Sequence, residues 1–188
     1  MMNKKNIQKV IFLDRDGVIN ENAKSGDYIK NLEELKLISL VKEAVHSLKD
    51  AGYILFIISN QAGINRRLIS KENFKDINQY ISRELAIPLE NMYYCPHKKE
   101  ENCECRKPKS GLLTRASIEH KISLPESYYI GDSLDDIIAA KAVGCKMIFV
   151  LTGRGNEQVK DIQSCKYKPN LIAKNLYEAS NFILGGKL

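Results

Sequence analysis

The sequence lacks an apolar run long enough to cross a membrane. The longest run covers only residues 53–58, whereas a helix that spans a bilayer needs about 20 apolar residues. Near the N-terminus, a few lysines precede a short apolar segment that ends at Asp14, which is not the pattern of a secretory signal. We therefore expect a cytoplasmic protein that does not associate with membranes.

The sequence also has little that indicates a nucleic-acid partner or several domains. It contains no dense block of basic residues, no internal repeat and no low-complexity linker. The net charge of +6 favours anionic partners in general, but over 188 residues it is also typical of an ordinary solvated surface. A content of 44% hydrophobic and 28% charged residues excludes a disordered chain. We predict one domain over residues 1–188, a monomer without a nucleic-acid partner.

Short apolar runs alternate with longer amphipathic segments along the chain. Residues 20–38 and 96–109 are long irregular connections, and such connections inside a compact domain are often functional. Because nearly continuous apolar strands alternate with helices, we predict an α/β fold with a doubly wound, mainly parallel sheet covered by helices on both faces. The predicted strands are 9–13, 53–58, 91–95, 128–130, 146–151 and 170–173, and the predicted helices are 40–51, 70–86, 110–121, 134–143 and 176–184.

Polar residues follow three of these strands directly. Asp14-Arg-Asp16-Gly17 follows the first strand, Ser59 to Gly63 follow the second, and Gly131 to Asp136 follow the fourth. Each segment alone could be a turn, since Asp and Gly are favoured there. Ligands of open α/β sheets bind outside the carboxyl ends of the strands. The three segments together therefore predict a site at that edge.

The residue types at this edge suit phosphoryl transfer through an enzyme aspartate. A carboxylate can attack phosphorus and split one difficult step into two. A divalent cation offsets the repulsion between the two anions, and Asp oxygens suit Mg²⁺. A second carboxylate can protonate the leaving oxygen and then deprotonate water. A hydroxyl and a lysine can hold the remaining phosphoryl oxygens.

A second group of reactive side chains lies in the loop at residues 95–105. Cys95, His97, Cys103 and Cys105 form a Cys₃His set, which is typical of a closed, tetrahedral structural zinc site. The alternative is a disulfide that joins Cys95 to Cys103 or Cys105, which is rare in the cytosol. Because four protein ligands leave no open position, we expect zinc to shape the loop and not to take part in chemistry.

These segments resemble the four motifs of the haloacid dehalogenase-like (HAD) phosphatases, in the same order over residues 9–150. The motifs are Phe12 to Asn20, Ser59-Asn-Gln61, Arg106-Lys107-Pro108 and Gly131 to Asp136. Within that superfamily, the Cys/His loop is similar to one subgroup. It contains the heptose 1,7-bisphosphate 7-phosphatases and the histidinol-phosphate phosphatases. The resemblance implies a HAD-like fold with a zinc loop in place of a large cap domain.

The resemblance also implies a role for each matching residue. Asp14 would be the nucleophile, and Asp16 the general acid and base. Ser59 would bond the phosphoryl group, and Lys107 would neutralise its charge. Mg²⁺ would be held by Asp14, by the backbone carbonyl of Asp16 and by Asp132.

Other positions have less defined roles. The resemblance gives Asp136 a supporting role, but Ser133 and Asp136 also have the spacing of a capping box at a helix start. A bisphosphate needs a second basic group, for which the forked guanidinium of Arg106 is suited, with Arg66 as another candidate. The candidate substrate-binding residues are Asn22, Ala23, Lys24, Ser25, Ser59, Asn60, Gln61, Arg66, Arg106 and Lys107.

The sequence favours a sugar bisphosphate substrate within this subgroup. The runs Gln61 to Arg66 and Pro108 to Leu113 are similar to the heptose branch. That branch implies a bacterial enzyme that supplies heptose for lipopolysaccharide. Ser133, where the heptose enzymes usually have Lys, and a longer loop at residues 21–28 depart from it. A histidinol-phosphate phosphatase and a non-catalytic, basic, zinc-stabilised nucleic-acid-binding module are the alternative hypotheses.

Overall fold

The computed structural model describes residues 8–24 and 27–186 and contains one six-stranded sheet. The strand order is β3-β2-β1-β4-β5-β6, and every neighbouring pair is parallel. The order reverses between β1 and β4, which creates a crevice at the carboxyl ends of those strands. The strands are β1 (Val10–Leu13), β2 (Ile54–Asn60), β3 (Met92–Cys95), β4 (Tyr128–Gly131), β5 (Lys146–Val150) and β6 (Leu171–Ala173).

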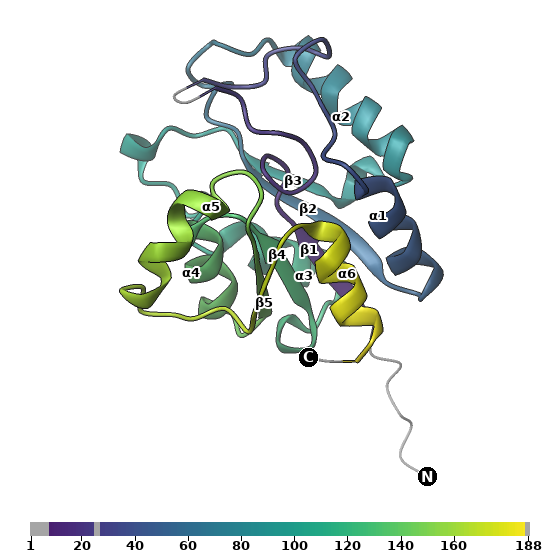
Figure 1. The fold of residues 1–188 in the computed structure, drawn as a ribbon. Coiled ribbons are helices and arrows are strands. Elements are labelled where there is room, and N and C mark those ends of the chain that lie inside the picture. The colour runs from purple at the N-terminus through teal and green to yellow at the C-terminus, as the bar shows by residue number, and fades with distance from the viewer. Residues whose placement is uncertain (1–7, 25–26, 187–188) are drawn as a thin grey trace.

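Helices cover both faces of this sheet, as Figure 1 shows. One face carries α1 (Val41–Asp50), α2 (Lys71–Leu85) and α6 (Leu176–Leu184). The opposite face carries α3 (Gly111–His120) and α4 (Leu134–Ala142), with the short α5 (Gly155–Gln158) beside them. The prediction of a doubly wound parallel α/β fold is confirmed.

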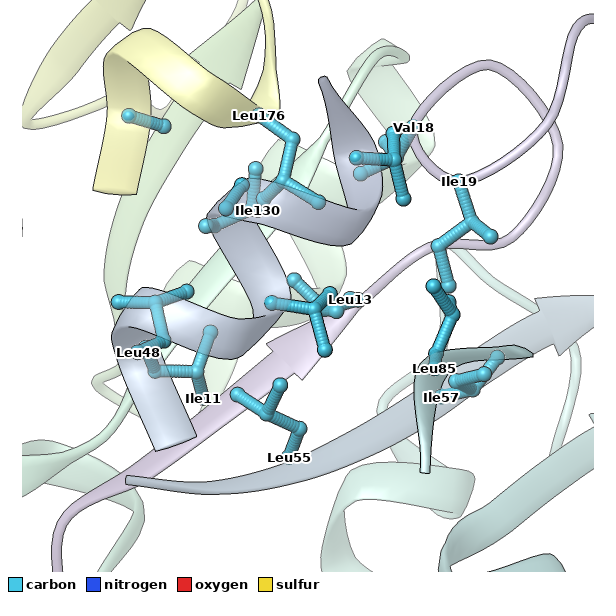
Figure 2. Close-up of a cluster of buried hydrophobic side chains, with 14 of the residues drawn as sticks. Ile11, Leu13, Val18, Ile19, Leu48, Leu55, Ile57, Leu85, Ile130 and Leu176 are labelled. Atoms are coloured by element: carbon cyan, nitrogen blue, oxygen red, sulfur yellow. The ribbon is translucent and has the colours of Figure 1, made fainter. Parts of the chain in front are cut away.

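The central strand β1 is buried on both sides, which explains its unbroken apolar sequence. Ile11 and Leu13 point into the core beneath α1 and α6, where they meet Leu48, Ile130 and Leu176 (Figure 2). The alternate β1 residues, Val10 and Phe12, belong to the core on the other face. Full burial of a side chain of this size contributes roughly 1.5–3 kcal/mol. Asp14, the next residue, is therefore anchored by a strand that has little freedom to move.

Local sequence signals set the helix boundaries. The hydroxyl of Ser70 accepts a hydrogen bond from the Asn73 amide (3.0 Å) and caps α2. In α4, the Ser133 hydroxyl accepts from the Asp136 amide (3.3 Å), and Asp136 Oδ2 accepts from the Ser133 amide (3.1 Å). The capping box predicted for Ser133 and Asp136 is thus present.

Every predicted strand and helix is present, with ends that differ by at most two residues. The sequence pattern missed α5 and the 3₁₀ turns at Leu89–Asn91, Lys99–Glu101, Leu124–Glu126 and Val159–Gln163. These segments have five residues or fewer, too few to show a helical period.

Among the described residues, no helix is long and apolar enough to span a bilayer.

Candidate active site

Three neighbouring strands bring their polar carboxyl ends together. The amide of Asp14 donates to the carbonyl oxygen of Ile130 (2.9 Å), so the end of β1 is tied to β4. Ser59 lies near the end of β2, and Asp132 directly follows β4. A cavity of about 190 Å³ opens at this point, lined by Asp14, Asp16, Asp27, Tyr28, Ser59, Asn60, Ala62, Arg106, Lys107, Asp132, Ser133, Asp135 and Arg154. The predicted phosphoryl-transfer residues therefore line one cavity.

Lys107 lies at the floor of this cavity and joins two carboxylates. Its ammonium is 2.9 Å from Asp14 Oδ1 and 2.7 Å from Asp136 Oδ1. It also donates to the carbonyl oxygen of Ile58 and to the hydroxyl of Tyr129, each at 3.1 Å. Lys107 is only 4% exposed, so its charge is offset by these partners and not by water.

Burial and these ion pairs set the ionisation of the three groups. Burial, together with the negative charges of Asp136 and Asp132, raises the pKa of Asp14 well above its usual value, against the opposing effect of Lys107. Burial opposes ionisation of Asp136 as well, but the Lys107 charge outweighs it and lowers the pKa of Asp136. For Lys107, the two carboxylates outweigh burial and raise the pKa, so the side chain is an ammonium at neutral pH.

Asp136 forms the predicted capping box and also contacts the Lys107 ammonium, while its supporting role in catalysis stays a prediction. Its Oδ1 pairs with Lys107 and accepts from the Tyr129 hydroxyl (2.9 Å), while Oδ2 accepts from the Ser133 amide (3.1 Å) and hydroxyl (2.6 Å). The residue caps α4 and supports Lys107 at the same time. Its two oxygens are fully used by these donors.

Asp16 is held in place by three donors. The Arg15 guanidinium contacts both carboxylate oxygens (2.9 and 3.0 Å), Asn20 Nδ2 contacts Oδ1 (2.8 Å), and Gln61 Nε2 contacts Oδ2 (2.7 Å). The same Gln61 amide donates to Ser59 Oγ (2.7 Å). Burial opposes the charge of Asp16, but the Arg15 charge and these hydrogen bonds lower its pKa. Without a ligand, Asp16 is a carboxylate.

Asp132 fits between two glycines. A Cβ on Gly17 would lie 2.0 Å from Asp132 Oδ2, and one on Gly153 would lie 2.1 Å from the same oxygen. Both glycines have a positive φ, +88° and +58°, which other residues adopt only with strain. The Arg154 amide donates to Asp132 Oδ2 (2.7 Å). Burial, with the Asp136 charge, raises the pKa of Asp132 to about 6.

The acidic cluster fits a hard metal ion. Carboxylate oxygens of Asp14, Asp132 and Asp136 lie within 4.8 Å of one another, and such oxygens suit Mg²⁺. Asp136 is already occupied by its donors. Among the described residues, no hydrogen-bond donor reaches Asp14 Oδ2, Asp132 Oδ1 or the backbone carbonyl of Asp16. Asp132 Oδ1 and the Asp16 carbonyl oxygen are therefore free to hold a cation, and Asp14 Oδ2 is free to contact a ligand of the cavity.

The Cys/His loop forms a second compact cluster. The thiols of Cys95 and Cys103 are 3.5 Å apart, those of Cys103 and Cys105 are 3.4 Å apart, and His97 Nδ1 is 3.2 Å from Cys105 Sγ. All four ligand atoms lie within 4.8 Å of one another. This spacing suits a tetrahedral metal ion with bonds of about 2.0–2.3 Å. The predicted four ligands are together, and the cysteines are unpaired thiols, not a disulfide.

The Cys/His loop leads directly into the segment that carries Lys107. Arg106 Nη1 donates to the carbonyl oxygen of His97 (3.2 Å). One residue further, the Lys107 amide donates to Asn60 Oδ1, and Asn60 Nδ2 donates to the Lys107 carbonyl oxygen, both at 3.1 Å. The Cys/His loop on one side and Asn60 on the other thus fix the backbone that presents Lys107.

Comparison with known proteins agrees with this geometry. A family model described as HAD-hydrolase-like matches residues 104–179. A D-glycero-beta-D-manno-heptose-1,7-bisphosphate 7-phosphatase from Helicobacter pylori is 39% identical over 138 residues, which cover 71% of this chain and 78% of that protein. The phosphatase of the same name from Haemophilus influenzae is 37% identical over 158 residues. The aligned region covers 79% of this chain and 84% of that protein. The chain belongs to the heptose-1,7-bisphosphate 7-phosphatase family.

Solved structures show the same family fold. The D,D-heptose 1.7-bisphosphate phosphatase from B. bronchiseptica, complexed with magnesium and phosphate, superposes with a TM-score of 0.87 at 26% identity and covers 95% of this chain and 99% of its own. A phosphatase of the same kind from Burkholderia thailandensis shares the fold, with a TM-score of 0.68 at 22% identity. This heptose-bisphosphatase family member is a HAD-like phosphatase, as the motifs predicted.

The structure separates the predicted substrate-binding residues of this family member into three groups. Ser59, Asn60, Arg106 and Lys107 line the cavity at Asp14. Asn22, Ala23, Lys24, Asn60 and Gln61 line an adjoining cavity of about 580 Å³. Arg66 is exposed and faces Glu100 at 3.8 Å, and it lines neither cavity. Ser25 lies outside the described residues.

Sequence reasoning missed several residues of the site in this phosphatase. Arg154 lines both cavities, and its amide binds Asp132. Tyr28 also lines both. Tyr129 lies in β4, and its hydroxyl accepts a hydrogen bond from the Lys107 ammonium. Arg154 could have been found, because it follows the fifth strand at the same edge of the sheet. A tyrosine in a buried strand gives no such signal.

Proposed function

We propose that this chain removes the C7 phosphate of D-glycero-D-manno-heptose 1,7-bisphosphate through a phospho-aspartate at Asp14. The observation that carries this proposal is the contact between Lys107 and Asp14 Oδ1 (2.9 Å), which leaves Oδ2 without a donor. A carboxylate with one oxygen held and the other free is oriented to attack. The relatives that cover most of the chain carry this activity in their names.

In the first step, Asp14 Oδ2 bonds to phosphorus as the bond to the sugar oxygen breaks. Lys107 stabilises the negative charge that spreads over the phosphoryl oxygens, and Ser59 Oγ donates to one of them. Asp16 gives its proton to the leaving oxygen. Asp16 is ionised without substrate, but the negative charge of an arriving phosphate raises the pKa of a nearby carboxyl and favours the protonated form.

In the second step, Asp16 takes a proton from water, and the water oxygen attacks the phospho-aspartate. The bond between phosphorus and Asp14 breaks, which restores the carboxylate and releases inorganic phosphate. Arg15, Asn20 and Gln61 keep Asp16 in reach of the cavity during both steps. Because these donors hold the Asp16 carboxyl group in place, it does not have to reorient before each proton transfer.

We propose Mg²⁺ as the metal of the acidic cluster, held by Asp14, Asp132 and the Asp16 carbonyl. The ion, when bound, offsets the charge of the phosphate and of the attacking carboxylate. The fit rests on the acidic cluster, in which Asp132 Oδ1 and the Asp16 carbonyl oxygen accept no hydrogen bond from the described residues, and the related B. bronchiseptica structure was solved with magnesium and phosphate. For the Cys/His cluster, we propose a structural Zn²⁺ that stabilises the loop before Arg106 and Lys107.

A bisphosphate also needs a cationic site for its second phosphate. Among the described residues of the Asp14 cavity, Arg106 and Arg154 are the cationic side chains besides Lys107. Lys107 is committed to Asp14 and Asp136, whereas the two guanidinium groups are available to an anion. We propose that Arg106 and Arg154 bind the second phosphate, and that Ser133 adds no charge of its own to the cavity. A single domain and a monomeric state stay predictions.

The decisive experiment compares phosphate release from three substrates. Heptose 1,7-bisphosphate, histidinol phosphate and fructose 1,6-bisphosphate are each tested with Mg²⁺ and with EDTA. We expect the heptose to be preferred by about a hundredfold or more in kcat/KM, equal to about 2.7 kcal/mol of differential transition-state binding. A preference for histidinol phosphate would refute the substrate, and Mg²⁺-independent release would refute the metal.

A further inference from the structure

Tyr129 is a buried phenol that the proposed chemistry does not use. It lies in β4 with no exposed surface, on the side of the sheet covered by α3 and α4. Its hydroxyl donates to Asp136 Oδ1 (2.9 Å) and accepts from the Lys107 ammonium (3.1 Å). The ammonium also lies 5.8 Å from the centre of the ring. A tyrosine in the core needs only one partner, and this one joins two charged groups.

The ammonium of Lys107 has more acceptors than protons. It carries three N–H bonds, while four acceptors surround it: Asp14 Oδ1, Asp136 Oδ1, the Ile58 carbonyl oxygen and the Tyr129 hydroxyl. Three of these acceptors belong to the protein core and stay in place. Asp14 is the exception, because in the proposed reaction it bonds to phosphorus. One N–H can therefore move between Asp14 and a phosphoryl oxygen while the others keep the ammonium in position.

We propose that Tyr129 is a positioning residue for Lys107, and that its hydroxyl keeps the ammonium directed toward Asp14 and away from Asp136. The hydroxyl acts on both ions: it occupies one lone pair of Asp136 Oδ1 and gives Lys107 a neutral acceptor. Without it, Asp136 Oδ1 has Lys107 as its remaining side-chain donor. The pair is already in contact at 2.7 Å, and it strengthens when the hydroxyl no longer shares Oδ1, since a buried ion pair is strongly attractive. The ammonium then directs its N–H bonds toward Asp136 and less toward the phosphoryl group.

This inference rests on the proposed role of Lys107, and two variants separate the two proposals. Tyr129→Phe removes the hydroxyl and retains the buried ring and its contact with the ammonium. Tyr128→Phe is the matched control, because it makes the same change one residue earlier in β4. Tyr128 lies in the core on the opposite face of the sheet, packed edge-on against Tyr53 at 6.3 Å.

We expect Tyr129→Phe to lower kcat about tenfold, the effect of a weakened charged hydrogen bond, and to leave KM within about twofold. Binding of trifluoroberyllate with Mg²⁺, which mimics an aspartyl phosphate, should weaken by a similar factor, while binding of inorganic phosphate stays unchanged. Tyr128→Phe should alter none of these values. Thermal unfolding of both variants shows whether each change is confined to the site.

Each outcome decides one proposal. If Tyr129→Phe matches the native protein in kcat and in trifluoroberyllate binding, the positioning role is wrong. If its losses are accompanied by an equal rise in KM and by a fall in melting temperature that Tyr128→Phe shares, Tyr129 is only a packing residue, and the inference again fails. If Lys107→Ala retains full turnover, the proposed function itself is wrong.

Discussion

The molecule has two clusters of metal-ligating side chains, and they are built in opposite ways. The Cys/His cluster comes from one loop, residues 95–105, with ligands adjacent in sequence. The acidic cluster combines the ends of β1 and β4 with Lys107 from a third segment. Its members are held by hydrogen bonds to the core, and Asp136 alone accepts from Lys107, Tyr129 and Ser133.

This contrast predicts which cluster depends on the metal that we propose for it. The acidic cluster keeps its geometry through protein contacts, so removal of Mg²⁺ should stop chemistry and leave the fold intact. The Cys/His ligands contact mainly one another, so we expect the metal proposed for this cluster to be what closes the loop. We therefore expect removal of Mg²⁺ to abolish turnover and removal of the Cys/His metal to disorder the loop as well. The following variants test this difference.

The largest effect is expected from loss of the nucleophile. Asp14→Asn keeps the shape of the side chain but removes the negative charge, so no phospho-aspartate can form. We expect kcat to fall by about 10⁴-fold or more, on the order of 5 kcal/mol in the barrier. Circular dichroism should be unchanged, because β1 anchors this position. Turnover near the native rate would refute the nucleophilic role of Asp14.

The next effect tests the Cys/His cluster. Cys105→Ser removes one ligand two residues before Lys107, so we expect loss of the bound metal, a lower melting temperature and at least about a tenfold fall in kcat. Elemental analysis by mass spectrometry measures the metal content. Cys165→Ser is the control, because Cys165 lies outside the cluster. Full activity in a metal-free Cys105→Ser protein would show that the loop does not position Lys107.

A third variant tests the close fit around Asp132. Gly153→Ala places a methyl group against Asp132 Oδ2, so the carboxylate must move. We expect the Mg²⁺ concentration for half-maximal activity to rise by about tenfold, as for other disturbed ligand shells. Gly52→Ala separates this clash from backbone strain, because Gly52 also has a positive φ, +85°, but has no atoms within 4 Å of its Cβ position. An equal shift in both variants would exclude the clash as the cause.

The smallest effects concern the second phosphate. Arg106→Ala and Arg154→Ala should each raise KM for the bisphosphate by about tenfold, from loss of a charged hydrogen bond, and leave KM for a monophosphate unchanged. Arg66→Ala should have little effect, since Arg66 is outside both cavities. A larger rise in KM for Arg66→Ala than for the other two would restore the prediction made from the sequence.

The sequence predicted the parts of this protein that depend on local pattern. The alternation of apolar strands and amphipathic helices indicated the sheet, and the residues after each strand indicated the site, because parallel strands end at one edge. Tyr129 and Arg154 were missed. In the sequence, Tyr129 looks like any other aromatic residue of a buried strand. Its contact with Lys107, which comes from a distant segment, is visible only in the structure. Arg154 follows β5 at the edge of the sheet that carries the site, so the same argument from strand ends could have included it.

Arg66 shows the opposite limit. It follows a catalytic motif in sequence, and the sequence therefore indicated a contact with substrate. In the structure Arg66 faces Glu100 at 3.8 Å and lines neither cavity, so its contact with substrate stays a prediction. Similarly, the need for glycine at positions 17 and 153 arises from the position of Asp132 between them. Such contacts join segments far apart in the chain, and no periodicity or local propensity encodes them.

The pairing of β1 with β4 has a consequence for the order in which the protein becomes active. Asp14 is synthesised well before Lys107 and Ile130, on which its position depends. Contacts between such distant residues form late, because closing a long loop costs more entropy. The Cys/His loop closes over a short segment and can bind its metal early. In refolding, metal uptake should thus precede the return of turnover, and an incomplete chain that ends before β4 has no catalytic centre.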